Sequence, residues 1–291
     1  MYLERYDSRS TTFWAWGNMD WTRRKALGAL GAAAFAAHPL TASAIETESF
    51  GIDYLENLGK PGAMNPKVAF IPPSKIDAAY SHVIYVNTAT NSKGGQKMWV
   101  IERAGSGWKL ALWDEKYWGK KGVDGEPPYS WLVSTGRHYP GEKRAGPTPL
   151  GIFNVDDRAS RHRRGWGSPG MYNSIYIDLH YGGGRISGVA MHGTTGGMYK
   201  RLGRADSHGC VRMTQGNAEQ VWQMFHPGSK PGQASPLWSE AVPRFFTSEP
   251  NQSRSARYGY VRDGSILTNA SGQRLTKPGY SALFVYFRDD L

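Results

Sequence analysis

Short runs of β-branched and aromatic residues recur along residues 82–191, and this recurrence limits the possible folds more than any other feature of the chain. Val83–Val86 and Lys97–Ile101 are two such runs, and the polar stretch between them is typical of a hairpin connection. Further runs cover residues 108–113, 130–135, 151–155, 174–179 and 186–191. Residues of these types pack well on a pleated surface. The sequence therefore predicts a mainly β domain of sandwich or closed-sheet type.

A single convincing helical pattern follows these runs. Apolar residues repeat at helical spacing from Ala218 to Phe225, Thr214 or Asn217 can cap the start, and Pro227 ends the pattern. We expect one principal helix, and one domain from residue 82 to residue 228, which is long enough to bury a core.

The segments outside this domain differ from it in character. Residues 1–44 contain Arg23-Arg24-Lys25, then the apolar run 26–37 and the small-residue site Ala42-Ser43-Ala44. This order is typical of a twin-arginine export signal, although an ordinary amphipathic helix can also carry paired arginines. Residues 45–81 have no sustained period and are predicted to be a linker or N-terminal extension. We interpret residues 229–291 as a C-terminal extension with strands at 258–262 and 282–287.

The export signal makes the chain's only cysteine, Cys210, informative. The run 26–37 is too short to cross a bilayer, so no stable membrane insertion is expected after cleavage. We expect a location in the periplasm or cell envelope, where cysteines usually pair. A lone cysteine has no partner within its chain and is a candidate nucleophile. A buried structural thiol is the alternative, but polar neighbours such as His208 and Arg212 favour a reactive thiol.

Two motifs resemble one known family. His192 precedes Ser207-His208-Gly209-Cys210-Val211-Arg212 by fourteen intervening residues, as in the signature of the L,D-transpeptidase catalytic domain. Ser134-Thr135-Gly136, followed by residues 146–153 (Gly-Pro-Thr-Pro-Leu-Gly-Ile-Phe), is similar to a second element of that family. The resemblance covers roughly residues 82–213. It implies an L,D-transpeptidase-like β-sandwich whose principal helix follows the cysteine.

The resemblance assigns the catalytic roles. Cys210 is the nucleophile, and His192 is the base and then the general acid, with a backbone carbonyl orienting its ring. We expect the thiolate and the imidazolium to stabilise each other. Gly209 allows a tight turn, and its N–H and that of Cys210 are candidate donors to the oxyanion. His208 is either an orienting residue or a structural, hydrogen-bonded one.

The remaining site residues are predicted to contact substrate. Ser207 and Arg212 are candidate substrate-binding residues. If the segment is extended, the Arg212 side chain faces the same side as that of Cys210. Arg212 could hold a carboxylate with two hydrogen bonds or form an ordinary structural ion pair. His192, His208 and Cys210 could also bind zinc, but they lack an evident fourth ligand. We therefore expect no metal and no cofactor.

The expected activity is that of an exported cysteine acyltransferase acting on peptidoglycan stem peptides. By resemblance, Cys210 forms a thioester and a second stem's amine resolves it to a 3→3 cross-link. Water as acceptor would make an L,D-carboxypeptidase, and a protein amine an anchoring enzyme. The resemblance also implies covalent inhibition by carbapenem-type β-lactams.

Two further alternatives stay open. One is a non-catalytic wall-binding protein that uses the aromatic and basic surface, and the other is an exported cysteine peptidase. The formal net charge of +11 favours anionic partners. Nucleic acid is not expected, because helix-turn-helix and zinc patterns are absent from the sequence.

Overall fold

The computed structural model describes twelve segments of the chain, all of which lie within residues 45–291. They are residues 51–64, 69–89, 95–112, 114–115, 130–142, 145–158, 160, 170–181, 185–230, 232–245, 248–249 and 266–289. The predicted export signal in residues 1–44 and the predicted strand at 258–262 lie outside the described residues.

The main sheet has six strands. Five of them follow the order β3-β2-β1-β14-β5, and the sixth, β4, also pairs with β2. They are β1 (His82–Asn87), β2 (Lys97–Ala104), β3 (Gly107–Leu110), β4 (Trp131–Leu132), β5 (Gly151–Asn154) and β14 (Ala282–Phe287). The predicted hairpin is confirmed, since β1 and β2 pair antiparallel. β14 runs parallel to β1 and antiparallel to β5, so residues far along the chain supply an interior strand.

A second sheet carries the residues around the cysteine. Its order is β10-β9-β6, with β6 (Ile175–Tyr176), β9 (Ala190–Gly193) and β10 (Val211–Met213). β9 and β10 run parallel, and β6 is antiparallel to β9. The remaining described strands form two small sheets, β11 (Trp238–Pro243) with β13 (Thr276–Tyr280), and β12 (Ser248–Glu249) with β7 (His180–Tyr181) and β8 (Arg185–Ile186).

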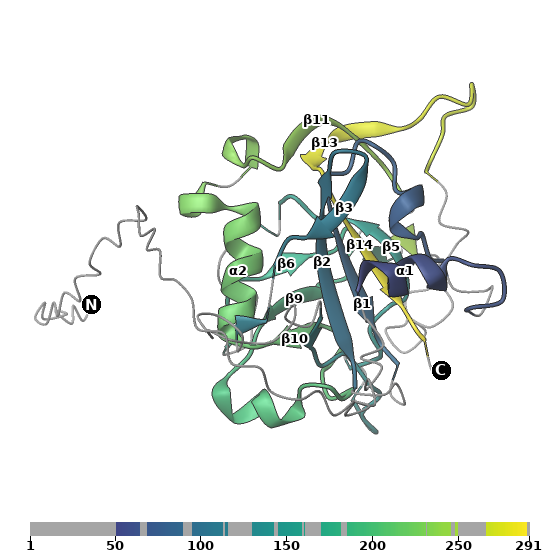
Figure 1. Cartoon of the computed structure of the whole chain (residues 1–291). Coiled ribbons are helices and arrows are strands. Elements are labelled where there is room, and N and C mark those ends of the chain that lie inside the picture. The colour runs from purple at the N-terminus through teal and green to yellow at the C-terminus, as the bar shows by residue number, and fades with distance from the viewer. Residues whose placement is uncertain are drawn as a thin grey trace, which may run out of the picture. The chain divides into compact units, whose positions relative to one another are not determined.

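The two faces of the main sheet bury two different cores. Side chains alternate along β1, so Ile84 faces one core and Tyr85 the other. The first core lies toward the second sheet and α2, and includes Ile84, Val100, Phe284, Met191, Val211 and Trp222. The second core lies toward α1, and includes Tyr85, Trp99, Val285, Phe287, Leu55 and Leu58. Figure 1 shows α2 and α1 on opposite sides of the main sheet. The domain is therefore layered and mainly β, as predicted.

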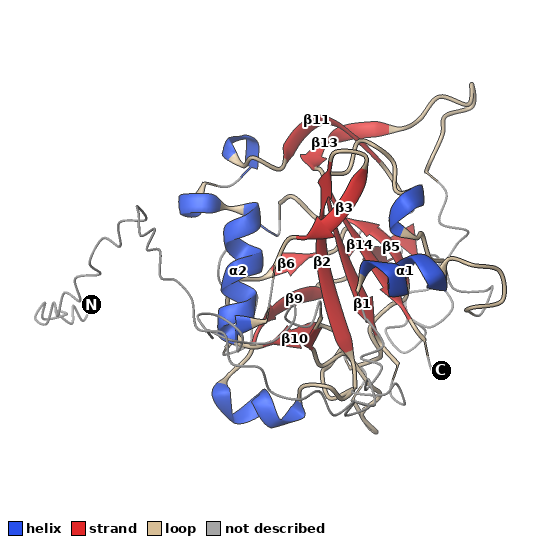
Figure 2. Cartoon of the chain, in the orientation of Figure 1, coloured by secondary structure: helices blue, strands red, loops and turns tan. Residues whose placement is uncertain are grey.

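Among the described residues, α2 (Gln215–Phe225) is the longest helix (Figure 2). Thr214 caps it, because its side chain accepts a hydrogen bond from the Asn217 N–H. The prediction of one principal helix after the cysteine is confirmed. Short 3₁₀ helices lie at Pro73–Lys75, Gly196–Arg201, Pro227–Ser229 and Gly232–Ala234. No described helix has the length and apolar character needed to cross a bilayer.

The segment predicted as a linker contains a helix. α1 (Ile52–Leu58) buries Leu55 and Leu58, which stand three residues apart and so share one helix face. Seven residues are too few to give a sustained period in the sequence, which explains why the pattern predicted no helix. The strands are also shorter than several of the predicted runs, such as β6 within residues 174–179.

Candidate functional site

The second sheet brings together the segment that contains His192 and the segment that contains Cys210. β9 and β10 are parallel neighbours in which His192 is the register partner of Arg212. Register partners on neighbouring parallel strands lie side by side and face the same side of the sheet. Cys210 stands two residues before Arg212 and packs against Ala190, which stands two residues before His192. The fold thus places Cys210, His192 and Arg212 at one corner of this sheet.

Cys210 is partly exposed at this corner. It packs against Tyr176 and Ala190, and its Sγ lies 3.6 Å from the Gly188 carbonyl oxygen. A partly exposed thiol can be reached by a substrate, as a nucleophile must be. The alternative of a fully buried structural cysteine does not agree with this exposure.

His192 is buried, with 4% of its surface exposed, and its ring is held by the main chain. Nδ1 lies 2.7 Å from the Gly193 carbonyl oxygen. A carbonyl only accepts, so Nδ1 carries the proton and Nε2 is the ring's acceptor. This is the orienting backbone carbonyl that was expected.

The environment of His192 keeps the imidazole neutral. Burial, and then the positive charge of Arg212, lower its pKa to about 4, although the hydrogen bond to Gly193 opposes the shift. At neutral pH the resting ring is therefore unprotonated. The geometry favours a neutral imidazole that acts as a base over the thiolate–imidazolium pair expected from the sequence.

The loop before Cys210 is closed by its own side chains. The Ser207 hydroxyl donates to the Cys210 carbonyl oxygen at 2.5 Å and accepts from the Gly209 N–H at 3.1 Å. Ser207 is fully buried, so the geometry favours a loop-shaping role over the predicted substrate contact. Gly209 has a φ of +133°, a value that favours glycine. Its N–H donates within the loop, which sets the Cys210 N–H ahead of it as the candidate oxyanion donor.

The two halves of the composite motif meet at Thr148. Its buried Oγ1 accepts from the Gly136 N–H at 2.8 Å and donates to the Gly209 carbonyl oxygen at 2.9 Å. A Cβ on Gly136 would lie 2.3 Å from the Gly146 carbonyl oxygen and 2.5 Å from the Gly209 Cα. Gly136 is therefore required by the close approach of three segments of main chain.

His208 points into a surface cluster on the same loop. Its Nε2 lies 3.0 Å from a Glu142 carboxylate oxygen, and its ring stacks on Tyr139 at 4.5 Å between centroids. About half of the His208 side chain is exposed. These contacts fit the structural alternative for His208 better than a catalytic role.

Arg212 contacts the main chain of the same loop, where Nη1 donates to the Asp206 carbonyl oxygen at 2.9 Å. The Asp206 carboxylate is contacted by two other arginines, Arg137 at 3.3 Å and Arg201 at 3.5 Å. Four residues of this surface were not predicted from the sequence: Arg137, Arg201, Tyr139 and Glu142. Arg137 directly follows the Ser-Thr-Gly motif, which is the one signal that could have drawn attention to it.

A residue from outside both motifs also reaches the site. Tyr286, on the interior strand β14, is fully buried. Its pKa is raised well above the ordinary value, first by burial and second by the negative charge that Cys210 carries when its thiol is ionised. The C-terminal segment thus brings a buried tyrosine near enough to Cys210 for the two groups to interact electrostatically.

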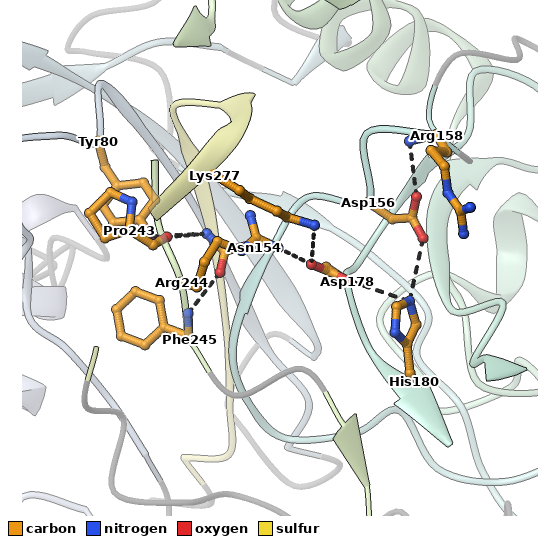
Figure 3. Close-up of polar contacts among 10 residues, drawn as sticks. All are labelled: Tyr80, Asn154, Asp156, Arg158, Asp178, His180, Pro243, Arg244, Phe245 and Lys277. Atoms are coloured by element: carbon orange, nitrogen blue, oxygen red, sulfur yellow. Dashed lines mark hydrogen bonds and ion pairs between the residues drawn. The ribbon is translucent and has the colours of Figure 1, made fainter. Parts of the chain in front are cut away.

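A different cluster has the spacing of metal ligands. Among the described residues, ligand atoms of Asp156, Asp178 and His180 lie within 4.8 Å of one another. Figure 3 shows that Arg244 and Lys277 already point at Asp178, which they contact as ion pairs. These built-in cations neutralise the carboxylate, so the charges fit a buried ion-pair network better than a metal centre. Cys210, His192 and His208 are not members of this cluster.

A family model matches the part of the chain that contains this site. The model of the L,D-transpeptidase catalytic domain (YkuD) matches residues 120–232, which contain His192, Cys210 and both motifs. Residues 120–232 of this chain are therefore similar to the L,D-transpeptidase catalytic domain. The match ends beyond α2, while the predicted resemblance covered residues 82–213, and both exclude β14.

Solved structures of L,D-transpeptidases are similar to this chain at low sequence identity. LD transpeptidase LdtMt1 in complex with imipenem is 16% identical, with 50% of this chain and 54% of that one covered and a TM-score of 0.25. L,D-transpeptidase 3 from Mycobacterium tuberculosis with a faropenem-derived adduct is 18% identical, with 50% and 56% covered and a TM-score of 0.28. This chain thus spans about half the length of these solved structures. No curated protein matches it.

Proposed function

We propose that this chain is a peptidoglycan L,D-transpeptidase whose nucleophile is Cys210. The observation that carries the proposal is the corner of the second sheet, where a partly exposed thiol directly precedes the strand β10, and the neighbouring strand β9 carries a neutral, oriented imidazole. A nucleophile and a base fixed by a third group are what acyl transfer through a covalent intermediate requires.

The first half-reaction forms a thioester. Cys210 Sγ attacks the carbonyl carbon of an L-centre in the donor stem, and its proton moves to Nε2 of His192. The Cys210 N–H is the candidate donor to the resulting oxyanion. When the C–N bond breaks, the leaving D-residue's amine takes the proton back from His192. The acyl group then remains on sulfur, and the imidazole is neutral again.

The second half-reaction transfers the acyl group. An amine of a second stem, the side chain of a diamino acid, attacks the thioester and gives its proton to His192. The C–S bond breaks, and His192 returns the proton to Cys210. The product is a 3→3 cross-link. Water or a protein amine can replace the acceptor in the same scheme, which gives a carboxypeptidase or an anchoring enzyme.

Product analysis tests this proposal. Purified protein incubated with disaccharide-tetrapeptides should yield cross-linked dimers detectable by mass spectrometry, and Cys210→Ala should yield none. Trimmed tripeptides alone would identify the carboxypeptidase instead. A wall-binding protein would bind the muropeptides, leave them unchanged and lose nothing in Cys210→Ala, which would contradict the proposal.

The compartment and the inhibitors belong to the same proposal. Export rests on the order of charge, apolar run and small-residue site in residues 1–44, and the intact mass of the protein recovered from cells tests cleavage after Ala44. A carbapenem should acylate Cys210 and add its mass to the protein, because a strained lactam carbonyl is open to the same thiol attack.

A further inference from the structure

Two arginines beside the nucleophile's loop share one oxygen atom. Arg137 Nη2 lies 3.3 Å and Arg201 Nη1 lies 3.5 Å from the same Asp206 atom, Oδ1. The two guanidinium groups are therefore close neighbours of like charge. About half of each side chain is exposed, whereas only 11% of the Asp206 side chain is. The nearly buried Asp206 carboxylate therefore pairs with two guanidinium groups that are exposed to solvent.

The local charge balance leaves an excess of positive charge. Arg212 also reaches Asp206, but at the carbonyl oxygen, which carries no net charge. The Glu142 carboxylate contacts His208 Nε2. Two arginines thus share a single carboxylate, and a third contacts the carbonyl oxygen of the same residue. Each guanidinium has five N–H donors in a planar fork, more than one shared oxygen can satisfy, and this fork fits a carboxylate with two parallel bonds.

Arg137 is held in a fixed position by a stacked cluster. Its guanidinium carbon lies 4.5 Å from the centre of the Tyr139 ring, and His208 stacks on the same ring at 4.5 Å. Two groups cannot occupy one face at this distance, so Tyr139 lies between them. The Tyr139 hydroxyl donates to the Asp206 carbonyl oxygen at 2.7 Å, which locks the ring. A pre-positioned cation binds an anion with less loss of side-chain freedom.

The cluster is rooted next to the catalytic loop. The Arg137 N–H donates to the Ser207 carbonyl oxygen at 3.0 Å, and Gly136 packs directly on Gly209. Gly209 is the residue before Cys210. A group bound between the two guanidiniums would therefore lie beside the loop that carries Cys210.

We propose that Arg137 and Arg201 form a binding site for a free carboxylate of the peptide substrate. This inference rests on the proposed function for the substrate's identity as a stem peptide. The substrate carboxylate accepts hydrogen bonds from the guanidinium N–H groups that do not contact Asp206. The Asp206 carboxylate holds the two arginines next to each other. The carboxylate comes either from the C-terminal residue or from a position within the stem.

Matched peptide analogues test the site. One analogue carries a carboxamide at the C-terminus and another carries carboxamides at the internal positions. For the unaltered enzyme we expect one of the two changes to raise KM roughly ten-fold, the scale of a charge-assisted hydrogen bond. In Arg137→Gln and Arg201→Gln, the acid and amide forms should have similar KM values, and kcat should change little. Arg274→Gln, which removes an exposed arginine paired with Asp77, is the control and should keep the preference.

The outcomes separate this inference from the proposed function. Cys210→Ala binds without turnover, so its affinity for acid and amide peptides tests the site even if no cross-link forms. An equal affinity for all analogues in that variant would overturn the carboxylate site. An equal loss for acid and amide peptides in Arg137→Gln would overturn it as well. If the protein binds acid peptides more tightly than amide peptides but transfers no acyl group, the carboxylate site is supported and the proposed transpeptidase function is contradicted.

Discussion

At the scale of single residues, His192 shows how burial sets the chemistry of the site. The ring lies in the second sheet with its Nδ1 proton committed to Gly193. The pKa of His192 is about 4 in the folded protein, against the ordinary value of 6.5 in the unfolded chain. The folded protein therefore keeps this imidazole neutral at pH values where the unfolded chain protonates it. The same burial that orients the base therefore makes folding sensitive to acid.

We predict that His192→Gln reduces the acid sensitivity of folding. Between pH 6.5 and 4 the unfolded wild-type chain binds a proton at this residue that the folded protein does not, so stability is lost as the pH falls. The loss should approach about 3 kcal/mol near pH 4 and be absent above pH 6.5. Urea unfolding at stepped pH measures it. Parallel pH curves for the two proteins would contradict the assignment.

The sequence predicted the identities of these residues but not all of their roles. The spacing of His192 and Cys210 reflects a local fact, two neighbouring parallel strands joined by a loop. The roles of Ser207 and Gly209 depend on which donors the closed loop has already used, and that depends on three-dimensional contacts. Apart from the place of Arg137 after the Ser-Thr-Gly motif, Arg137 and Tyr139 gave no signal, because their partner Asp206 lies far along the chain.

At the scale of elements, Thr148 connects three loops that no single strand or helix unites. The Ser-Thr-Gly turn, the segment before β5 and the loop before Cys210 all contact this one hydroxyl or its neighbours. The position of the nucleophile therefore depends on a buried side chain 62 residues earlier in the sequence.

We expect Thr148→Val to affect both stability and reactivity. The change keeps the shape but leaves the Gly136 N–H and the Gly209 carbonyl without this partner, at a cost of about 1–3 kcal/mol. Acylation of Cys210 by a carbapenem, followed by intact-protein mass, should slow at least about ten-fold because the loop shifts.

Thr88→Val is the matched control for this variant. Thr88 is also a buried threonine, and its Oγ1 donates to the Phe287 carbonyl oxygen at the end of β14. It should lower stability by a similar amount without slowing acylation. If both variants react at the wild-type rate, Thr148 does not position the nucleophile.

At the scale of the whole molecule, the C-terminal residues are part of the domain's interior. The sequence predicted a strand at 282–287 and interpreted residues 229–291 as an extension that packs on the domain. The structure places that strand between β1 and β5. Neighbours in a sheet that are distant in sequence leave no local pattern, so the order of strands could not be predicted.

Buried ion pairs also connect residues 229–291 to the preceding part of the domain. Arg244, only 7% exposed, pairs with Asp178, which follows β6, and Lys277 lies 3.4 Å from the same carboxylate (Figure 3). Arg244→Leu should cost about 3–5 kcal/mol, because it removes one partner from a buried pair. Arg274→Leu breaks an exposed pair and should cost at most about 1 kcal/mol. Urea denaturation compares them, and equal costs would show that burial does not matter here.

The parallel pairing of β1 with β14 has a consequence for biosynthesis. Two hundred residues separate these neighbours, so a nascent chain emerging from the ribosome exposes a gap in its sheet, with unsatisfied amides on both rims, until residues 282–287 arrive. Docking across such a separation is slow, because a very long loop must close first. Maturation of this protein therefore finishes late, and the interval before it does is when chaperones, proteases or aggregation would act on the polypeptide.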